Sequence, residues 1–362
     1  MRASYESIFE AAVGPPAARS GLWPGLICRL PKPLLVIPMI VHWLWLALRY
    51  GSLSLPSAAD PSLAIGGLVG ESKCDYFDQV EPNLRRWLAR TTKVAAGATV
   101  VADARAELTR MGLAFPVIAK PDIGWCGFGV RRIDDEAALD DYVSAYPKGE
   151  TLLLQSFLDL PGEAGLFYVR RPEEGRGRLL SLTVRHPPQV VGDGVSTIRT
   201  LLSLDGRLRG RSKSYEDLDR VPGAGETATL STVWSHRMGG RYRDLSSAIT
   251  PALEETIDAI ASSMPNLHVA RFDVRFASLA GLASGEDFKV IEINGAGSEA
   301  IEFFDPNVPF FTAYRGILAK QAMVFEIADR NRRRGFAPCG WRALATAFHH
   351  QARLLDLYPA SN

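Results

Sequence analysis

The sequence is short of cysteine, and the cysteines it has are far apart. Cys28, Cys74, Cys126 and Cys339 are the four in 362 residues, and no two of them form a CxxC pair. This spacing argues against a structural zinc site and against a disulfide framework. The sequence therefore predicts a protein of a reducing, cytoplasmic setting.

The chain also lacks an excess of charge of either sign. Its 41 Lys and Arg residues and 40 Asp and Glu residues give a formal net charge of +1. No global field would recruit nucleic acid, so we expect no nucleic-acid partner, and any anion site must be local. With 47% hydrophobic and 22% charged residues the composition is that of a globular protein, and the length is enough for two or three packed lobes.

An apolar run near the N-terminus is too short for a bilayer-spanning helix, which needs roughly 20 residues. The run PLLVIPMIVHWLWLAL covers residues 33–48, and Arg29, Lys32 and Arg49 flank it. Its two tryptophans beside cations would suit a membrane interface. The short length favours a buried or packed helix, with a peripheral membrane contact or a partner-docking helix as alternatives.

Helix and strand patterns alternate over the rest of the chain, which predicts an α+β (α/β) fold. Leu84, Trp87 and Leu88 share one helical face, so we expect a helix there and a lobe boundary near residue 95. Apolar runs predict strands at 115–120, 151–157, 165–172, 177–186, 268–276 and 288–295. Periodicity and caps predict helices at 102–113, 134–146, 250–264, 311–335 and 341–358.

One strand ends in a lysine and runs at once into a glycine-spaced loop. In VIAKPDIGWCGFGVRRI, residues 117–133, Lys120 is followed by Gly124, Gly127 and Gly129 before a second strand begins. The pattern fits a β-hairpin with a long turn. It also fits a flap that folds over a polyphosphate, because glycine lets backbone N–H groups approach phosphates closely.

Two later strands, RFDVRF and VIEING, carry polar residues among apolar ones. Glu292 and Asn294 are two apart and point to the same face, while Ile291 and Ile293 face the core. If the strands pair antiparallel, Asp273 joins them. Two carboxylates and an amide oxygen are the hard donors that Mg²⁺ on nucleotide phosphates requires.

These acids have a second explanation, a polar solvent face on a hairpin. Burying acids between apolar runs is costly unless a cation compensates, which favours the metal. Arg271, two residues before Asp273, points to the same side. It is expected to pair with the acids or to hold an anion beside the metal.

VIAKP with its glycine loop, LLLQSFLDLPGEAGLFYV, VVGDGVSTI and RFDVRF…VIEING occur in this order. With them the chain resembles the ATP-grasp superfamily over roughly residues 90–310, in particular its D-alanine–D-alanine ligase-like, carboxylate–amine ligase branch. The resemblance implies an ATP-grasp fold in which two α+β lobes clamp a nucleotide. The implied regions are an N-terminal region 1–95, a small lobe 96–190, a large lobe with the metal site 191–315, and C-terminal helices 316–362.

The resemblance also implies roles for single residues. Lys120 would contact the α- and β-phosphates of ATP, with Lys93 as an earlier nucleotide lysine, and the loop from Gly124 to Gly129 would close over the phosphates. Mg²⁺, with Mn²⁺ as a substitute, would bind Asp273, Glu292 and Asn294, and Arg271 would stabilise the anionic transition state. The adenine and ribose would be contacted by Gln155, Phe157, Leu158 and Glu163.

The implied activity is an ATP- and Mg²⁺-dependent ligase that joins a small-molecule carboxylate to an amine through an acylphosphate. A phosphotransferase of the same fold is one alternative. A membrane-associated nucleotide-binding protein without catalysis, anchored by residues 33–48, is another.

Overall fold

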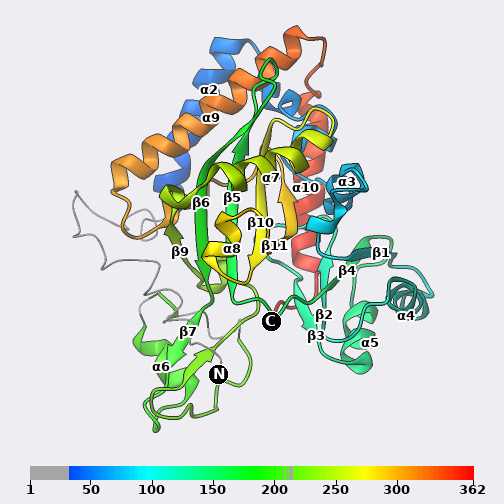
Figure 1. Ribbon diagram of the computed structural model, residues 1–362, viewed down its shortest axis with the longest axis vertical. Helices are drawn as coiled ribbons and strands as arrows, with labels where there is room; N and C mark the ends of the chain where they lie inside the picture. Colours follow the sequence, from blue (N-terminus) through cyan, green and yellow to red (C-terminus); the bar gives the residue numbers. More distant parts are fainter. Residues whose placement is uncertain (1–31, 206, 210, 212–214) are drawn as a thin grey trace. The chain divides into compact units, whose positions relative to one another are not determined.

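The computed structural model describes residues 32–205, 207–209, 211 and 215–362 (Figure 1). Residues 1–31 of the predicted N-terminal region, with Cys28, lie outside the described residues. The chain forms two compact units. Unit 1 comprises Met1–Leu88, Asp159–Val184 and Tyr242–His349, and unit 2 comprises Ala89–Leu158, Arg185–Arg241 and His350–Asn362. The boundaries predicted at 95, 190 and 315 follow one another along the chain, whereas each unit collects three separate stretches.

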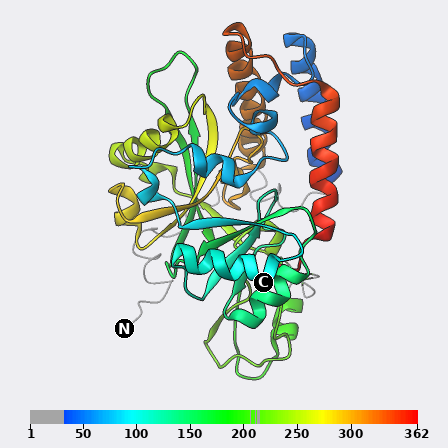
Figure 2. The same ribbon diagram turned by 90° about the vertical axis from the view of Figure 1, so that its right-hand side faces the viewer.

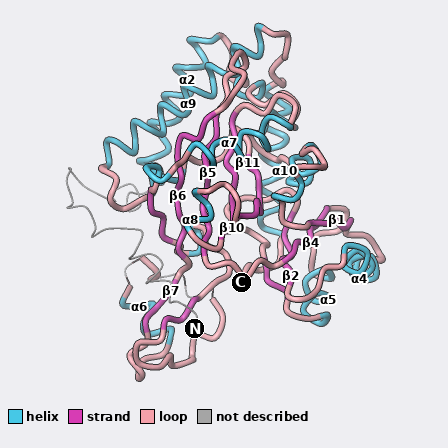
Figure 3. Tube along the Cα trace, viewed as in Figure 1, coloured by secondary structure: helices cyan, strands magenta, loops and turns pink. Residues whose placement is uncertain are grey.

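The predicted mixed class is confirmed, because helices and strands alternate along the described chain (Figure 3). The helices of unit 1 are α2 (Lys32–Tyr50), α3 (Lys73–Gln79), α7 (Pro251–Ser263), α8 (Leu279–Ala283) and α9 (Phe310–Arg333). Its sheet is built from β5 (Gly162–Val169), β6 (Arg178–His186), β9 (Arg241–Asp244), β10 (Val269–Phe276) and β11 (Phe288–Asn294), of which the last two residues of β6 and the first of β9 belong to unit 2. The helix α10 (Trp341–Leu357) begins in unit 1 and ends in unit 2.

One face of the five-stranded sheet of unit 1 is apolar. The opposite face, called the polar face below, carries charged side chains beside a second apolar cluster that includes Phe167, Val169 and Val269. The strand order of the sheet is β11-β10-β5-β6-β9, and β10 pairs antiparallel with both β5 and β11. Along β10, Ala270, Phe272 and Val274 join the core that α7 and α8 cover. The alternate residues, Arg271 and Asp273 among them, point to the opposite face because side chains alternate along a strand.

A β-bulge interrupts the pairing of β10 with β11. Asp273 pairs with Glu292, whereas the next residue, Val274, pairs with Val290, so Ile291 is the extra residue. The core contains Val290 and Ile293 but not Ile291. The prediction that Ile291 faces the core is therefore wrong, because the bulge breaks the period of two on which it rested.

The predicted N-terminal helix is confirmed as α2, which lies alongside α9 (Figures 1 and 2). One face of α2, with Leu46 and Ala47, packs into a cluster that includes Phe325 of α9. His42 Nδ1 lies 2.8 Å from Gln321 Oε1, and the Tyr314 hydroxyl donates to the carbonyl of Leu35 at 2.9 Å. These contacts fix α2 along the length of α9.

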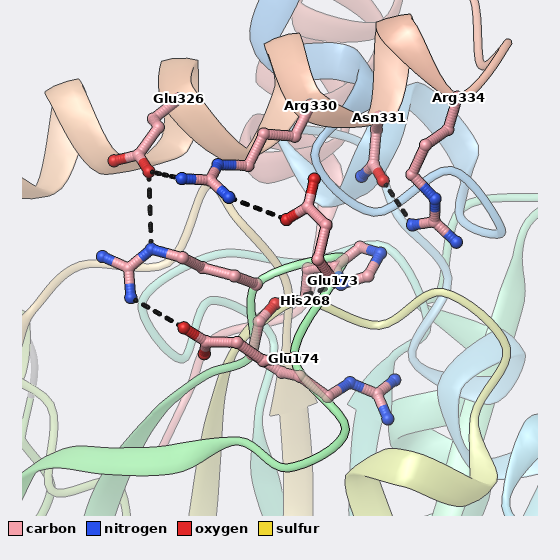
Figure 4. A network of polar contacts seen from close by, with 9 residues as sticks. Glu173, Glu174, His268, Glu326, Arg330, Asn331 and Arg334 are labelled. Carbon is pink, nitrogen blue, oxygen red and sulfur yellow. Dashed lines mark hydrogen bonds and ion pairs between the residues drawn. The ribbon is translucent and has the colours of Figure 1, made fainter.

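Ion pairs attach the C-terminal half of α9 to the turn between β5 and β6 (Figure 4). Arg330 pairs with Glu173 at 2.7 Å and with Glu326 at 2.8 Å. Arg171 reaches Glu326 at 3.4 Å. His268 lies near these ion pairs (Figure 4). Its own burial lowers its pKa to about 4, so this histidine is neutral at pH 7.

Unit 2 contains a four-stranded antiparallel sheet with the order β1-β4-β2-β3. Its strands are β1 (Thr91–Ala95), β2 (Val117–Pro121), β3 (Arg131–Ile133) and β4 (Thr151–Ser156), covered on one face by α4 (Val100–Met111) and α5 (Glu136–Ser144). A smaller part holds β7 (Gln189–Val191), β8 (Thr227–Thr229) and α6 (Ile198–Leu204).

The prediction of a helix around Leu84, Trp87 and Leu88 is wrong. The chain there makes only a short 3₁₀ turn at Arg85–Trp87 and then enters β1. Thr91, Thr92 and Val94 are β-branched and favour a strand, which overrides the short apolar spacing before them.

Candidate functional site

Three predicted nucleotide residues of unit 2, Lys93, Lys120 and Gln155, share one face of its sheet. Lys93 on β1 and Lys120 on β2 both lie opposite Leu153 of the central strand β4, and Gln155 lies opposite Thr91. Directly opposed residues, and residues two apart, point to the same face. The other face belongs to the apolar core with Leu152 and Leu154. Lys120, which is part of a sequence motif, and Lys93, which is not, thus lie on the same face of the sheet.

Lys120 is held in a hydrogen-bonded chain on that face. Its Nζ donates to Oε1 of Gln155 at 3.0 Å, and Nε2 of Gln155 donates to the Thr91 hydroxyl at 2.8 Å. Lys120 is only 6% exposed and Gln155 3%. An ammonium group fixed in this way is preorganised to meet an anion, because its rotamer is set before a ligand arrives.

The glycine loop after β2 turns its carbonyl groups toward other parts of unit 2. Tyr358 donates to the carbonyl of Ile123 at 2.6 Å, and Gln351 donates to that of Gly124 at 3.0 Å. Arg237 donates to the carbonyls of Cys126 at 3.1 Å and Gly127 at 2.9 Å. The loop is therefore held by the C-terminal part of α10, by Tyr358 just after it and by Arg237. No pattern in the sequence predicts these contacts.

The backbone of this loop needs its glycines. Gly127 and Gly129 have φ angles of 75° and 69°, in the left-handed region that favours glycine. A Cβ at Gly127 would lie 2.4 Å from the side chain of Val233, and one at Gly129 2.7 Å from Pro121. The hairpin explanation of the sequence is confirmed by the antiparallel pairing of β2 with β3, while the closing of the loop over phosphates stays a prediction.

The remaining nucleotide residues lie in different surroundings. The guanidinium carbon of Arg132 lies 4.6 Å from the ring centre of Phe157. Leu158 is half-buried and is the last residue of the first stretch of unit 2. Glu163 belongs to unit 1, where it is buried and pairs with Arg275 at 3.0 Å. If Glu163 binds the ribose hydroxyls, its carboxylate has to accept hydrogen bonds from them while it also pairs with Arg275.

The predicted metal residues are gathered on the polar face of the sheet in unit 1. Asp273 lies opposite Glu292, and Arg271 opposite Asn294, so all four side chains share that face. Arg271 donates two hydrogen bonds to the carboxylate of Asp273, from Nε to Oδ1 at 2.8 Å and from Nη2 to Oδ2 at 3.1 Å. Nδ2 of Asn294 donates to Oδ2 of Asp273 at 3.2 Å. Lys73 of α3 pairs with Glu292 at 3.5 Å.

This donor set fits a hard divalent cation such as Mg²⁺. Among the described residues there is no cluster of three or more His, Cys, Asp or Glu side chains that could hold a metal alone. Asp273 and Glu292 supply two carboxylates. The hydrogen bond from Nδ2 of Asn294 to Asp273 holds the amide group of Asn294 in place beside them. A cation that keeps water and takes phosphate oxygens needs only one or two protein carboxylates.

A glycine makes room at the centre of this face. Gly165 of β5 lies opposite Asp273, and a Cβ there would approach Oδ1 of Asp273 to 3.3 Å and Cδ1 of Ile301 to 2.7 Å.

We expect Gly165→Ala to displace the Arg271–Asp273 pair, to cost about 1–3 kcal/mol of stability and to lower turnover. Denaturation curves and ATP turnover of the purified variant test this. Gly175→Ala, where a Cβ meets nothing within 4 Å, is the control, and equal losses in both variants would contradict the account.

Sequence reasoning missed two buried acids beside this face. Asp60 is fully buried and accepts hydrogen bonds from the backbone of His268 at 2.7 Å, Val269 at 3.0 Å and Ala296 at 3.1 Å. Glu71 accepts one from Gly295 at 3.2 Å. Burial raises the pKa of both carboxyls to about 7. These acids fix the start of β10 and the chain just after β11.

Lys320 of α9 was also missed. Its Nζ lies 5.5 Å from the ring centre of Phe167, which is the cross-strand neighbour of Arg271. Burial, and to a lesser extent the charge of Arg271, lowers the pKa of Lys320 to about 8, against the opposing effect of Glu299 and Glu302. A second cation therefore stands beside Arg271. No signal in the sequence around Lys320 distinguishes it from an ordinary surface lysine of a long helix.

The similarity of this chain to known proteins is distant. No protein-family model and no curated protein matches the sequence. Similar solved structures include the VanG D-Ala:D-Ser ligase from Enterococcus faecalis (12% identity, 70% of this chain and 61% of that chain, TM-score 0.41). Others are a D-alanine–D-alanine ligase from Bacillus anthracis (11%, 73% and 68%, 0.41) and a bifunctional glutathione synthetase from Pasteurella multocida (15%, 70% and 36%, 0.36).

Two of these solved structures are named as ligases and one as a synthetase. The chain spans 36% of the length of the glutathione synthetase and 61% of that of the D-Ala:D-Ser ligase. At this level of likeness nothing about substrates or site residues carries over, so we base the function on the side chains.

Proposed function

We propose that the chain is a cytoplasmic ATP- and Mg²⁺-dependent ligase that joins a carboxylate to an amine through an acylphosphate. One observation carries the proposal. The assigned nucleotide residues on the strands of unit 2 share the sheet face opposite its helix-covered core, and the assigned metal residues share the corresponding face of the sheet in unit 1. A merely structural role would not need lysines and carboxylates sorted in this way.

In the proposed reaction, a carboxylate oxygen of the first substrate attacks the γ-phosphorus of ATP, and the bond to the β-phosphate oxygen breaks. The amine then attacks the acyl carbon, inorganic phosphate leaves, and the nitrogen loses a proton. The first step brings anion to anion, so it needs fixed positive charge. Mg²⁺ would supply charge neutralisation of the phosphates, with Asp273, Glu292 and Asn294 as its ligands.

The cations of the chain have separate roles in this proposal. Lys120, held by Gln155 at 3.0 Å, would bind the α- and β-phosphates. Arg271 would stabilise charge on the transferred phosphoryl group, and its hydrogen bonds to Asp273 fix its direction. Because these groups are buried or half-buried, their fields are screened less than at an exposed surface.

The test of the proposal is product analysis with purified protein, ATP and Mg²⁺ over amino acids, small peptides and amines. A ligase releases ADP and phosphate only when both acceptors are present. Transfer of ¹⁸O from a labelled carboxylate to the released phosphate would support the acylphosphate. A stable phosphorylated product from one acceptor would instead identify a phosphotransferase, and nucleotide binding with no turnover for any pair would overturn the proposal.

Lys120→Ala is expected to weaken ATP binding by about 1.5–3 kcal/mol, the scale of a charge-assisted hydrogen bond. Isothermal titration calorimetry with ATP would show this as a Kd raised by about 10- to 150-fold. The control is Lys148→Ala, an exposed lysine of the same unit. Thermal unfolding of both variants separates loss of the contact from loss of the fold, and an unchanged Kd in a folded Lys120→Ala protein would remove Lys120 from the site.

A further inference from the structure

The helix α2 exposes an apolar face. Leu34, Ile37, Val41, Leu44 and Leu48 recur at intervals of three and four residues and are all exposed, Val41 by 61% and Leu48 by 84%. This spacing places them along one side of the helix. Trp45 beside them is 51% exposed. The sequence favoured a buried or packed helix, but only the opposite side of α2 packs against α9.

A contiguous apolar helix face in water is unfavourable and marks a surface for a partner. The side chains are aliphatic and large, with a tryptophan at one end, a composition that suits the boundary between lipid headgroups and acyl chains. Among the described residues, no helix is long and apolar enough to cross a bilayer.

The charged residues of the described segment that forms α2 and the chain just after it are all basic. Residues 32–59 contain no Asp or Glu, whereas they contain Lys32 and Arg49. Arg49 lies at the C-terminal end of α2, with its guanidinium 5.5 Å from the ring centre of Trp45. Near the other end of α2, Arg315 of α9 is exposed next to Tyr314, which donates a hydrogen bond to Leu35.

We propose that the outer face of α2 binds the surface of an anionic lipid bilayer. The helix lies in the interfacial plane, with its aliphatic row among the upper acyl chains and Arg49 and Arg315 against lipid phosphates. A second copy of the chain is the less suitable occupant, because pairing this face with itself would bring together two segments that carry cations and no acids. Each cation near an anionic bilayer instead adds about 1 kcal/mol of attraction. This inference does not depend on the proposed ligase activity.

The test is flotation of the full chain with vesicles of phosphatidylcholine alone or mixed with phosphatidylglycerol. We expect binding to the mixed vesicles that weakens as salt is raised. The double variant Val41→Glu, Leu48→Glu is expected to bind at least about tenfold more weakly, because charged groups are costly among acyl chains. The matched control is Val195→Glu, Leu204→Glu, which changes residues 83% and 73% exposed in another part of the chain.

Arg49→Ala with Arg315→Ala is expected to reduce binding to phosphatidylglycerol vesicles and to flatten its salt dependence. No binding of the folded wild-type chain to either vesicle would overturn the proposal. So would equal binding by the two glutamate double variants. Sedimentation of the wild type as a dimer that Val41→Glu, Leu48→Glu dissociates, without vesicle binding, would assign the face to a second copy instead.

Discussion

Glu292→Gln is expected to lower Mg²⁺-dependent ATP turnover by about a hundredfold or more while the protein stays folded. The substitution keeps the shape of the side chain and removes the charge that the proposed metal requires. Losing one preorganised charge contact at a transition state typically costs a factor of this size. Glu292 is partly exposed, and a glutamine can still accept a hydrogen bond from Lys73, so the protein is expected to stay folded.

The measurement is steady-state ADP release at saturating ATP and Mg²⁺, with thermal unfolding of the same samples. Glu255→Gln, on an exposed position of α7, is the matched control and is expected to retain wild-type turnover. If Glu292→Gln turned over ATP as fast as the wild type, the metal assignment on the polar face of unit 1 would be wrong.

Asp60→Asn is expected to flatten the pH dependence of stability. The pKa of Asp60 is raised from 3.8 to about 7 by burial, so the native state keeps a proton that the unfolded chain loses. The stability from this group is fully present below about pH 4 and is lost as the pH rises toward 7. The shift corresponds to about 4 kcal/mol over that window. Asparagine does not titrate, so this part of the loss disappears in the variant.

Urea denaturation at pH 4.5, 6 and 8 measures the effect as a difference between wild type and variant, in which the titrating groups that do not interact with the Asp60 carboxyl cancel. Among these is the imidazole of His268, whose lowered pKa of about 4 acts in the opposite sense, because its stability is lost as the pH falls below 6.5. The asparagine loses one hydrogen bond to Ala296 and starts out less stable than the wild type at pH 4.5. A stability gap that stays the same at all three pH values would show that Asp60 is not a buried, titrating anchor.

Much of the candidate site could be predicted from the strand period. Asp273, Glu292, Asn294 and Arg271 share a face because antiparallel pairing places 273 opposite 292 and 271 opposite 294. That arrangement needs only a period of two and a pairing direction. Ile291 was misplaced because a bulge adds one residue to one strand, and nothing local in VIEING marks it.

The residues that were missed are distant in sequence from the motifs. Asp60 meets the strand start at His268 and the chain at Ala296, more than 200 residues later. Gln351 and Tyr358 hold the glycine loop from the far end of the chain. Local patterns carry no information on such contacts, which form only when separate stretches return to one unit.

The most direct test of the central claim is a titration of Mn²⁺, standing in for Mg²⁺, into the protein with ADP, followed by electron paramagnetic resonance. The account predicts stoichiometric Mn²⁺ binding that requires the nucleotide and that Glu292→Gln weakens strongly, while Glu255→Gln leaves it unchanged. Nucleotide-dependent Mn²⁺ binding that is equally tight in wild type and Glu292→Gln would contradict it, because the cation would then be held somewhere other than the polar face of unit 1.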